Sequence, residues 1–379
     1  MKKKFIPVSE PFLNGNEKKY VNHALDTNWI SSRGEYVDLF ENKFASYSGV
    51  NYATSVSNGT NAIHLGLKAL DIKSGDEVIL PDFTMICSAL PIIYLGATPV
   101  FVDAERETWN IDPRKIEEKI TCKTKAIMVV HIYGHPCDMK PIKEIAKNHN
   151  LKIIEDAAEA HGAQYFGNKC GNFGDLAAFS FFSNKVITTG EGGMVTTNDI
   201  ELYNKLRYYK DLCFPLSGER TYIHQDIGFQ YRFSNIQAAI GLAQVEKIDE
   251  YIEMRRKNND LFQKYLSDVS GITFQPQKPE CKNIYWVNAA VVDEDILGIS
   301  RDELCEELLI IGIQTRKFFV PMHHQPALMK YSSNIMNDYP ISNWLSKNGF
   351  YFPSSTHLKP EIIKYICDET KKIIWGKRK

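Results

Sequence analysis

The sequence predicts an α/β fold, with a large N-terminal domain built on a mostly parallel, mixed sheet and a smaller C-terminal α/β domain. The main evidence is the alternation of short β-rich runs with helical patterns through the first 200 residues. These runs contain Val, Ile and Phe without strict alternation, which is typical of strands buried on both faces. The length of 379 residues also favours two or three domains over a single module.

The individual elements follow from local patterns. Six strands are expected at residues 77–81, 98–103, 126–133, 152–156, 177–182 and 194–197. Helical patterns lie between several of them, at residues 61–70, 114–120 and 142–148.

The pattern changes near residue 235. One long helix is expected from Ser234 through Phe262, with a length suited to connecting two domains. A strand is expected at 284–292, then a turn containing Gly298 and a helix at 301–311 that Ser300 caps. We therefore divide the chain into a large domain at residues 1–245 and a small domain at 246–379.

Composition excludes several classes of protein. Lys and Arg total 45 against 46 Asp and Glu, so no positive field favours nucleic acid. The sequence contains neither a secretory signal pattern nor an apolar run long enough for a membrane span, so we expect a cytoplasmic protein without membrane contact. Eight cysteines without a Cys-x-x-Cys pair fit neither a disulfide framework nor a zinc ribbon. His131 and His135 belong to an expected strand, where their spacing does not bring them together, and we assign no metal.

The first candidate site residues belong to the sequence Ser-Asn-Gly-Thr at 57–60, which directly precedes a predicted helix. Gly59 lets the backbone approach a ligand, and Thr60 supplies a hydroxyl beside the unpaired amides of the first turn. This combination suits an anion. The alternative is an ordinary capped helix after a turn.

A second candidate lies at the end of an apolar strand. Asp156 ends this strand, and Glu159 follows three residues later, on the same side if a helical turn begins there. A carboxylate in this place suits a cationic ring nitrogen. The alternative is a structural ion pair or a helix cap.

The third candidate is Lys185, which follows a buried strand and precedes a turn with glycines at 190, 192 and 193. We expect these glycines to let the backbone pass tightly under a planar ligand. Alone, a loop lysine is most simply solvated. Together, an amine, an anion site and a carboxylate are the three groups that pyridoxal 5'-phosphate needs.

These motifs carry a resemblance. Ser-Asn-Gly-Thr at 57–60, Glu-Asp-Ala-Ala-Glu-Ala-His-Gly at 155–162 and Phe-Ser-Phe-Phe-x-Asn-Lys at 179–185 are similar to those of the DegT/DnrJ/StrS sugar aminotransferases. Further tracts at 29–34, 133–139, 231–241 and 315–323 agree, so the resemblance spans nearly the whole chain. It implies an aspartate-aminotransferase-like fold, fold type I of pyridoxal phosphate enzymes.

The resemblance also implies residue roles. Lys185 would bind the cofactor covalently and carry a proton, and Asp156 would face its ring nitrogen. The other residues expected around the cofactor are Gly59, Thr60 and Ser180 at the phosphate, Glu159 near the ring hydroxyl, and Met85 where relatives often place an aromatic side chain. Either Gln230 or Arg232, in the stretch 228–232, would reach the phosphate of a partner subunit, so a homodimer with shared active sites is expected. Many relatives carry Asn at the position of Gln230.

The implied reaction moves an amino group from L-glutamate to a keto sugar nucleotide resembling GDP-4-keto-6-deoxymannose, for surface polysaccharide biosynthesis. Arg316 and His323 would border the acceptor pocket, although a surface ion pair and a loop histidine are equally simple interpretations. One alternative acceptor is another phosphorylated ketone, either a different nucleotide sugar or a small keto phosphate. A different class of alternative is a regulatory protein that keeps the fold without turnover.

Overall fold

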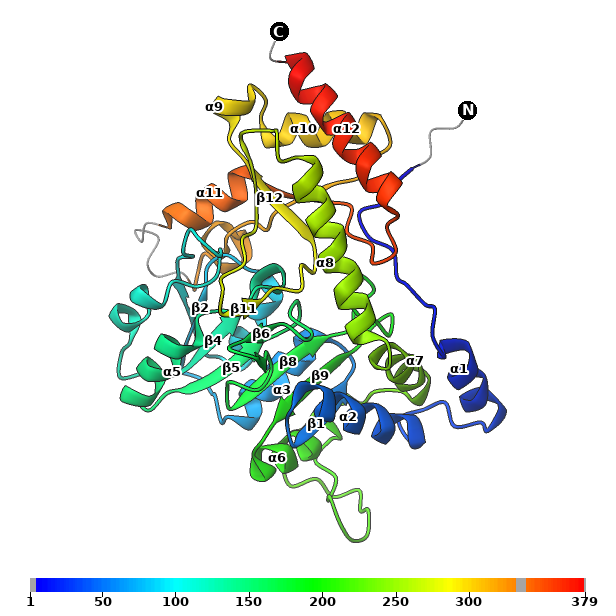
Figure 1. Ribbon diagram of the computed structural model, residues 1–379. Coiled ribbons are helices and arrows are strands. Elements are labelled where there is room, and N and C mark those ends of the chain that lie inside the picture. Colours follow the sequence, from blue (N-terminus) through cyan, green and yellow to red (C-terminus); the bar gives the residue numbers. More distant parts are fainter. Residues whose placement is uncertain (1–4, 332–338, 378–379) are drawn as a thin grey trace.

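The computed structural model describes residues 5–331 and 339–377. Its large domain is built on a seven-stranded sheet in the order β1-β9-β8-β5-β4-β2-β3 (Figure 1). The strands are β1 (Tyr52–Val56), β2 (Glu77–Pro81), β3 (Thr98–Val102), β4 (Thr124–Val130), β5 (Lys152–Asp156), β8 (Leu176–Ser180) and β9 (Gly193–Thr197). The pairs β3-β2, β2-β4, β4-β5 and β5-β8 are parallel, whereas β9 runs antiparallel to both β8 and β1. The predicted mostly parallel, mixed sheet is therefore confirmed.

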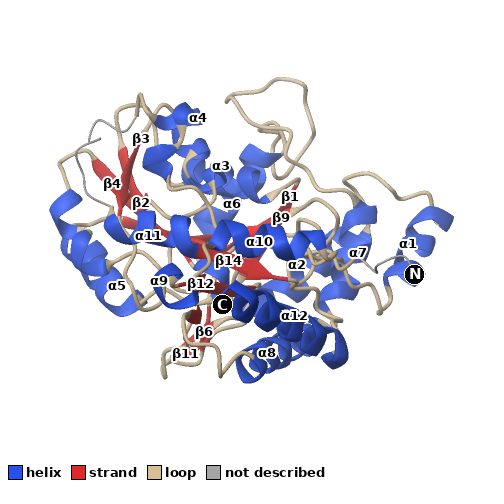
Figure 2. Ribbon diagram, turned by 90° about the horizontal axis from the view of Figure 1, so that it is seen from above, coloured by secondary structure: helices blue, strands red, loops and turns tan. Residues whose placement is uncertain are grey.

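Both faces of this sheet are buried, as β4 illustrates. Ala126 and Met128 pack into an apolar cluster with the helices α3 (Gly59–Ala69), α4 (Leu90–Tyr94) and α6 (Ile200–Lys210). Ile127 and Val129 pack into another cluster, which includes residues of α5 (Met139–Asn148). Successive side chains of a strand point to opposite faces, so burial on both faces removes the polar alternation from the sequence. Figure 2 shows helices surrounding the strands.

A second sheet forms the smaller C-terminal part, in the order β10-β12-β14-β13. Its strands are β10 (Ile272–Phe274), β12 (Asn288–Val292), β13 (Arg316–Lys317) and β14 (Gly349–Phe352). An apolar cluster joins it to α8 (Ile248–Tyr265), α10 (Arg301–Ile310) and α12 (Pro360–Lys377) (Figure 1). Ile6 belongs to this cluster, so the start of the described chain lies against the C-terminal sheet. The two-part α/β architecture agrees with fold type I, and the division at residues 245 and 246 stays a prediction.

Three predicted elements differ in the structure. The long helix from 235 is two helices, α7 (Asn235–Val245) and α8, and the break is fixed because Glu246 accepts hydrogen bonds of 2.8 Å from Asn16 and Tyr20. Residues 114–120 form short 3₁₀ turns. The strand expected from 284 begins at Asn288, because the amides of the preceding segment bind the loop after β4 instead.

Other elements match or extend the prediction. The strands β2 and β5 have the predicted bounds, and Ser300 caps α10 in a reciprocal bond with Glu303. Elements that local patterns did not indicate include α1 (Glu17–Asp26), α2 (Glu35–Ser48), β1, α6, α9 (Glu294–Leu297), α11 (Pro340–Asn348), α12 and a small sheet of β6 (Gln164–Tyr165), β7 (Asn168–Lys169) and β11 (Cys281–Lys282). None of the described helices combines the length and apolar character needed to cross a bilayer.

Candidate active site

The candidate site lies at the carboxyl ends of the parallel strands. The segments that follow β1, β2, β5 and β8 contain Gly59, Met85, Glu159 and Lys185, respectively. Because these strands run in the same direction, their carboxyl ends meet at one edge of the sheet, where open α/β sheets bind ligands.

The anion site forms where β1 leads into α3. Asn58 caps this helix, since its side-chain oxygen accepts a 2.8 Å hydrogen bond from the amide of Asn61. The amides of Gly59 and Thr60 fall in the first turn, which has no intrahelical acceptors for them. A Cβ atom at residue 59 would lie 2.8 Å from Cβ of Ser180, so glycine is required for this loop to approach the end of β8. The structure thus brings Gly59, Thr60 and Ser180 together.

Two of the glycines after Lys185 lie in close contact with other parts of the protein. A Cβ atom at Gly193 would collide with the backbone of Asn58, and one at Gly192 would collide with Thr189 and Phe233. These glycines therefore allow the turn to pack against the protein itself, including the back of the anion site. The passage of this backbone under a planar ligand stays a prediction.

Asp156 is buried at the last position of β5. Its carboxylate accepts a 2.7 Å hydrogen bond from the Ser88 hydroxyl and a 3.2 Å bond from the amide of Ala158. Burial raises the pKa of Asp156, and these two hydrogen bonds and the nearby Lys185 oppose that rise. A buried carboxylate in such a place is stabilised by a cation. A protonated ring nitrogen is a group of that kind.

Glu159 lies one turn beyond Asp156 and is also buried. Its carboxylate accepts a 2.7 Å hydrogen bond from the amide of Tyr133, which has a positive φ of 55°. Burial raises the pKa of Glu159 to about 7, although Lys185 and the Tyr133 amide lower it. This carboxyl group therefore exchanges its proton near neutral pH.

Lys185 follows β8 in a turn closed by a 3.0 Å bond from its amide to the carbonyl of Phe182. The lysine is half-buried, and its Nζ lies 4.0 Å from the ring centroid of Trp286. Burial lowers the pKa of Lys185, whereas Glu159 and Asp156 raise it. The predicted lysine is therefore near enough to both predicted carboxylates to be influenced by their charge.

Met85 lies at the start of the short 3₁₀ helix that carries Ser88. It is 46% exposed, so its thioether is free to pack against a ligand at the site. The link through Ser88 places the Met85 segment next to Asp156.

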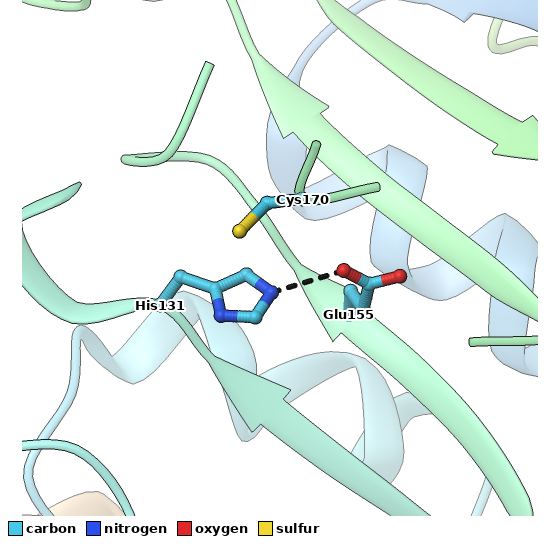
Figure 3. A group of neighbouring side chains, drawn as sticks. All are labelled: His131, Glu155 and Cys170. Atoms are coloured by element: carbon cyan, nitrogen blue, oxygen red, sulfur yellow. Dashed lines mark hydrogen bonds and ion pairs between the residues drawn. The ribbon is translucent and has the colours of Figure 1, made fainter. Parts of the chain in front are cut away.

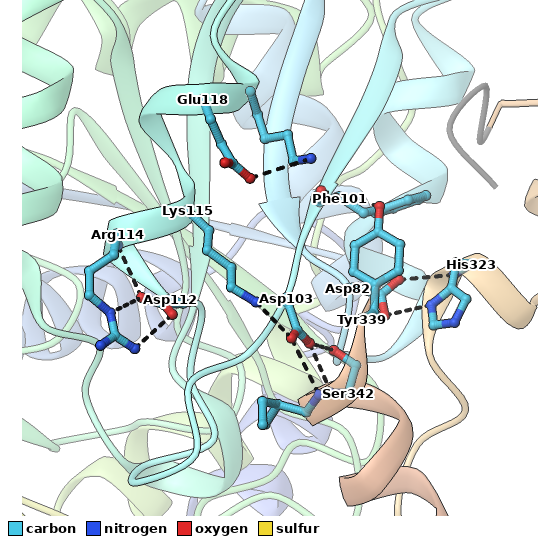
Figure 4. Close-up of polar contacts among 12 residues, drawn as sticks. Asp82, Phe101, Asp103, Asp112, Arg114, Lys115, Glu118, His323, Tyr339 and Ser342 are labelled. Carbon is cyan, nitrogen blue, oxygen red and sulfur yellow. Dashed lines mark hydrogen bonds and ion pairs between the residues drawn. The ribbon is translucent and has the colours of Figure 1, made fainter. Parts of the chain in front are cut away.

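Arg316 and His323 come from the C-terminal part of the chain. Arg316 is exposed in β13 and pairs with Tyr351 of β14. The ring of Tyr351 lies 6.3 Å from that of Tyr133, whose amide binds Glu159, and this contact connects β14 to the site. The ring of His323 forms a 2.7 Å contact with the buried carboxylate of Asp82, just beyond the end of β2 (Figure 4). His323 is therefore already engaged with the protein, and it holds the segment after β13 against the large domain.

Gln230 and Arg232 flank Tyr231, whose carbonyl accepts a 3.1 Å hydrogen bond from the amide of Ser57 just before the anion site. Gln230 is exposed and forms a β-bridge with Asp211, and Arg232 makes a 2.7 Å ion pair with the same aspartate. Both residues stand at the base of the loop 212–228, which projects from the molecule beneath α6 (Figure 1). Their action in a partner's site stays a prediction.

A buried group beneath the site contains His131, Glu155 and Cys170 (Figure 3). His131 Nε2 lies 3.0 Å from Glu155, and its Nδ1 accepts a hydrogen bond from the amide of Cys137. Glu155 also accepts bonds from three backbone amides, at residues 171, 173 and 174. The ligand atoms of the histidine and the carboxylate are thus used within the protein, as a brace that fixes the strand carrying Asp156.

The residues fit pyridoxal 5'-phosphate. First-turn amides beside Ser180 suit the phosphate, and buried Asp156 suits a protonated ring nitrogen. Burial lowers the pKa of Lys185, which lies near both carboxylates, and a nucleophilic amine requires such a lowered pKa.

Comparison with known proteins decides the family. The DegT/DnrJ/EryC1/StrS aminotransferase family matches residues 11–371. The chain belongs to this family. It is therefore an aminotransferase, and its cofactor is pyridoxal 5'-phosphate.

Individual relatives agree with this assignment over their full lengths. The aminotransferase is 47% identical to GDP-perosamine synthase of Escherichia coli O157:H7 over 96% of this chain and 97% of the relative. It is 44% identical to GDP-perosamine synthase of Caulobacter vibrioides, covering 93% and 94% of the two chains. An aminotransferase structure from Psychrobacter cryohalolentis matches with a TM-score of 0.92 and 30% identity, covering 99% of this chain and 100% of that one. These likenesses confirm the predicted family.

Sequence reasoning missed three residues of the aminotransferase site. Ser88 binds Asp156, Trp286 covers the amine of Lys185, and Arg255 binds the carbonyls of both Trp286 and Lys185. Each comes from a segment distant in the sequence and lacks a local motif. The unusual presence of an arginine at an apolar position of α8 was the one available signal.

Proposed function

We propose that this aminotransferase transfers an amino group from L-glutamate to the keto carbon of a GDP-linked 4-keto-6-deoxy sugar. The observation that carries the proposal is the proximity of Lys185 to the charges of Asp156 and Glu159 at one sheet edge, in a chain 44 to 47% identical to two GDP-perosamine synthases. The names of those relatives support a GDP-sugar acceptor and a role in polysaccharide biosynthesis.

In this proposal the cofactor, when bound, supplies an electron sink for negative charge on the reacting carbon. Asp156 holds the proton of the ring nitrogen by its buried negative charge, which Ser88 stabilises. Lys185 Nζ accepts the α-proton of the donor and later returns a proton during amination of the acceptor. The lowered pKa of Lys185 favours the uncharged amine that this transfer needs.

We further propose a homodimer in which Gln230 and Arg232 complete the partner's phosphate site. The loop 212–228 supports this, because its apolar side chains face solvent in one chain: Tyr222 is 87% exposed and Ile227 is 85% exposed. Exposed apolar side chains grouped on one projecting loop indicate a surface that another protein covers. Gln230 and Arg232 stand at the base of this same loop.

Arg316 and His323 remain candidates for the acceptor side of the site. Arg316 reaches the cluster through Tyr351, and His323 fixes the segment that follows β13 against Asp82. We also propose that the aminotransferase is cytoplasmic and that its two domains are residues 1–245 and 246–379.

The acceptor is tested by incubating purified protein with L-glutamate and a panel of ketones. The panel contains GDP-, dTDP- and UDP-linked 4-keto-6-deoxy hexoses and a small keto phosphate, and the aminated product is measured by mass spectrometry. We expect turnover to be fastest with the GDP-linked sugar. Turnover of the small keto phosphate alone would contradict the proposal. A Lys185→Ala protein serves as the matched control for non-enzymatic amination.

A further inference from the structure

Trp286 lies against the ε-amino group of Lys185 although the two residues are far apart in the sequence. Nζ of the lysine is 4.0 Å from the centroid of the ring, and Trp286 is buried. An ammonium group over an indole face is attracted by the electrons of the ring at separations up to about 6 Å. The contact therefore joins the central amine of the site to the C-terminal part of the chain.

The backbone and the indole of Trp286 are both fixed. Its amide donates a 3.0 Å hydrogen bond to the carbonyl of Tyr133, and its indole Nε1 donates a 2.8 Å bond to the carbonyl of Asn184. Its own carbonyl accepts a hydrogen bond from Arg255. The two backbone bonds therefore fix the position of the residue, and a rotation of the ring away from Lys185 would break the bond from Nε1 to Asn184.

Arg255 connects the same two residues from α8. Its guanidinium donates to the carbonyls of Trp286 and Lys185, the latter at 3.4 Å, and to Thr356 Oγ1 at 3.0 Å. These three partners are uncharged oxygens. Burial lowers the pKa of Arg255 to about 9. Burying a cation among neutral groups is costly. A role that offsets this cost is to hold the carbonyls of Trp286 and Lys185 at a fixed spacing through two nitrogens of one guanidinium.

We propose that Trp286 is a positioning residue, which holds the ε-amino group of Lys185 over its ring face. An aromatic face stabilises the ammonium form without offering a base that takes its proton. Such a support suits an amine that must be released, carry a proton and return it. The inference rests on the role proposed for Lys185, and it adds a residue that family motifs do not indicate.

Several charged groups also act on this amine. Glu159, Asp156 and Cys87 raise the pKa of Lys185, whereas burial and the positive charge of Arg255 lower it. The ring face of Trp286 belongs to the raising influences, since it favours the charged form. Loss of the ring should therefore lower the pKa of Lys185 while these other groups stay in place.

The test measures the pKa of Lys185 in cofactor-free protein. The acetylation rate of Lys185 by acetic anhydride is followed against pH and read from its peptide by mass spectrometry. We expect Trp286→Leu to lower this pKa by about one pH unit, and Trp286→Phe to lower it by less, because phenylalanine keeps an aromatic face with a weaker attraction for cations. Trp344→Leu is the matched control, because that ring faces Arg106, and it should leave the pKa unchanged. An unchanged pKa in a folded Trp286→Leu protein overturns the proposal.

A second measurement covers the case in which Trp286→Leu does not fold. Biosynthetic replacement of tryptophan by mono-, di- and trifluorinated analogues preserves the shape of the ring while weakening its attraction for cations. We expect the pKa of Lys185 to fall stepwise with the number of fluorine atoms, and a constant pKa overturns the proposal. Because cofactor and substrates are absent, these results are independent of whether the proposed reaction occurs.

Discussion

The hydroxyl of Ser88 donates a 2.7 Å hydrogen bond to the carboxylate of Asp156, although 68 residues separate them. The bond is buried, and it opposes the rise that burial causes in the pKa of the aspartate. It links the segment after β2 to the end of β5, so two parallel strands jointly form the site for a cationic ring nitrogen.

The Ser88→Ala variant should therefore have a lower kcat/KM at the acidic end of its pH profile. Without the hydroxyl, the pKa of Asp156 rises further, and the ionised form is lost at a higher pH. A hydrogen bond to a charged group contributes about 1.5–3 kcal/mol, so we expect the acidic limb of kcat/KM to move to higher pH and kcat/KM on that limb to fall roughly tenfold or more. The measurement is the pH profile of kcat/KM, with Ser88→Thr as the control that keeps a hydroxyl. Superimposable profiles for Ser88→Ala and wild type would show that the bond is dispensable.

Lys185→Ala should abolish transamination and leave the protein folded. The side chain is half-buried in a turn, so its removal takes little from the apolar core. Activity and thermal unfolding are measured together, with Lys205→Ala as the control because that lysine forms a surface pair with Asp71. Normal turnover by the Lys185 variant would remove the lysine from the mechanism.

Glu159 should make stability depend on pH. Its pKa is about 7 in the folded chain and 4.5 as the ordinary value, so the folded state holds an extra proton between these limits. The contribution of Glu159 to the free energy of unfolding is fully present below about pH 4.5 and is lost as the pH rises to about 7. The total change is on the order of 1–3 kcal/mol.

Denaturant unfolding of the cofactor-free protein between pH 5 and 8 checks this expectation. The decline in unfolding free energy should be smaller in Glu159→Gln than in wild type, because the amide does not titrate. Glu144→Gln is the control, since Glu144 is exposed on α5. Equal slopes for Glu159→Gln and wild type would show that the carboxyl group titrates normally.

His323→Gln should affect the acceptor half of the reaction more than the donor half. His323 donates its amide to Asp82 at 3.0 Å and contacts the same carboxylate through its ring, so it fixes the segment after β13. We expect amination of the acceptor to slow about tenfold, and amine uptake from glutamate to change little. The half-reactions are followed separately by stopped-flow absorbance, with His324→Gln as the neighbouring control. Equal losses in both halves would remove the link to the acceptor.

Mixed dimers test the shared site. The Lys185→Ala variant and a Gln230→Ala/Arg232→Ala double variant should each have little or no activity alone. When the two variants are unfolded, mixed and refolded together, part of the activity should return. Restoration follows because one of the two sites in a mixed dimer contains both intact sets. Inactive mixed dimers, with dimerisation verified by light scattering, would place these residues in their own chain's site.

The sequence predicted those parts of the site that local patterns encode. Asp156 and Lys185 each follow an apolar run, and Gly59 stands in a turn before a helix, so strand ends and helix starts were visible without the structure. Topology then brought them together, as expected for parallel strands.

Long-range contacts account for the remainder. Neither Ser88 nor Trp286 has a local pattern that indicates a role, because each acts on a residue from another segment. The division of the predicted long helix likewise depends on Glu246, whose side chain binds residues of the N-terminal part. Such contacts are set by tertiary packing, which overrides local helical preference.

The central claim is that Lys185 binds pyridoxal 5'-phosphate covalently. The most direct measurement is borohydride reduction of the cofactor-loaded protein, followed by peptide mapping with mass spectrometry. We expect one cofactor per chain, attached at Lys185. Attachment at a different lysine, or no attachment after reconstitution, would contradict the claim.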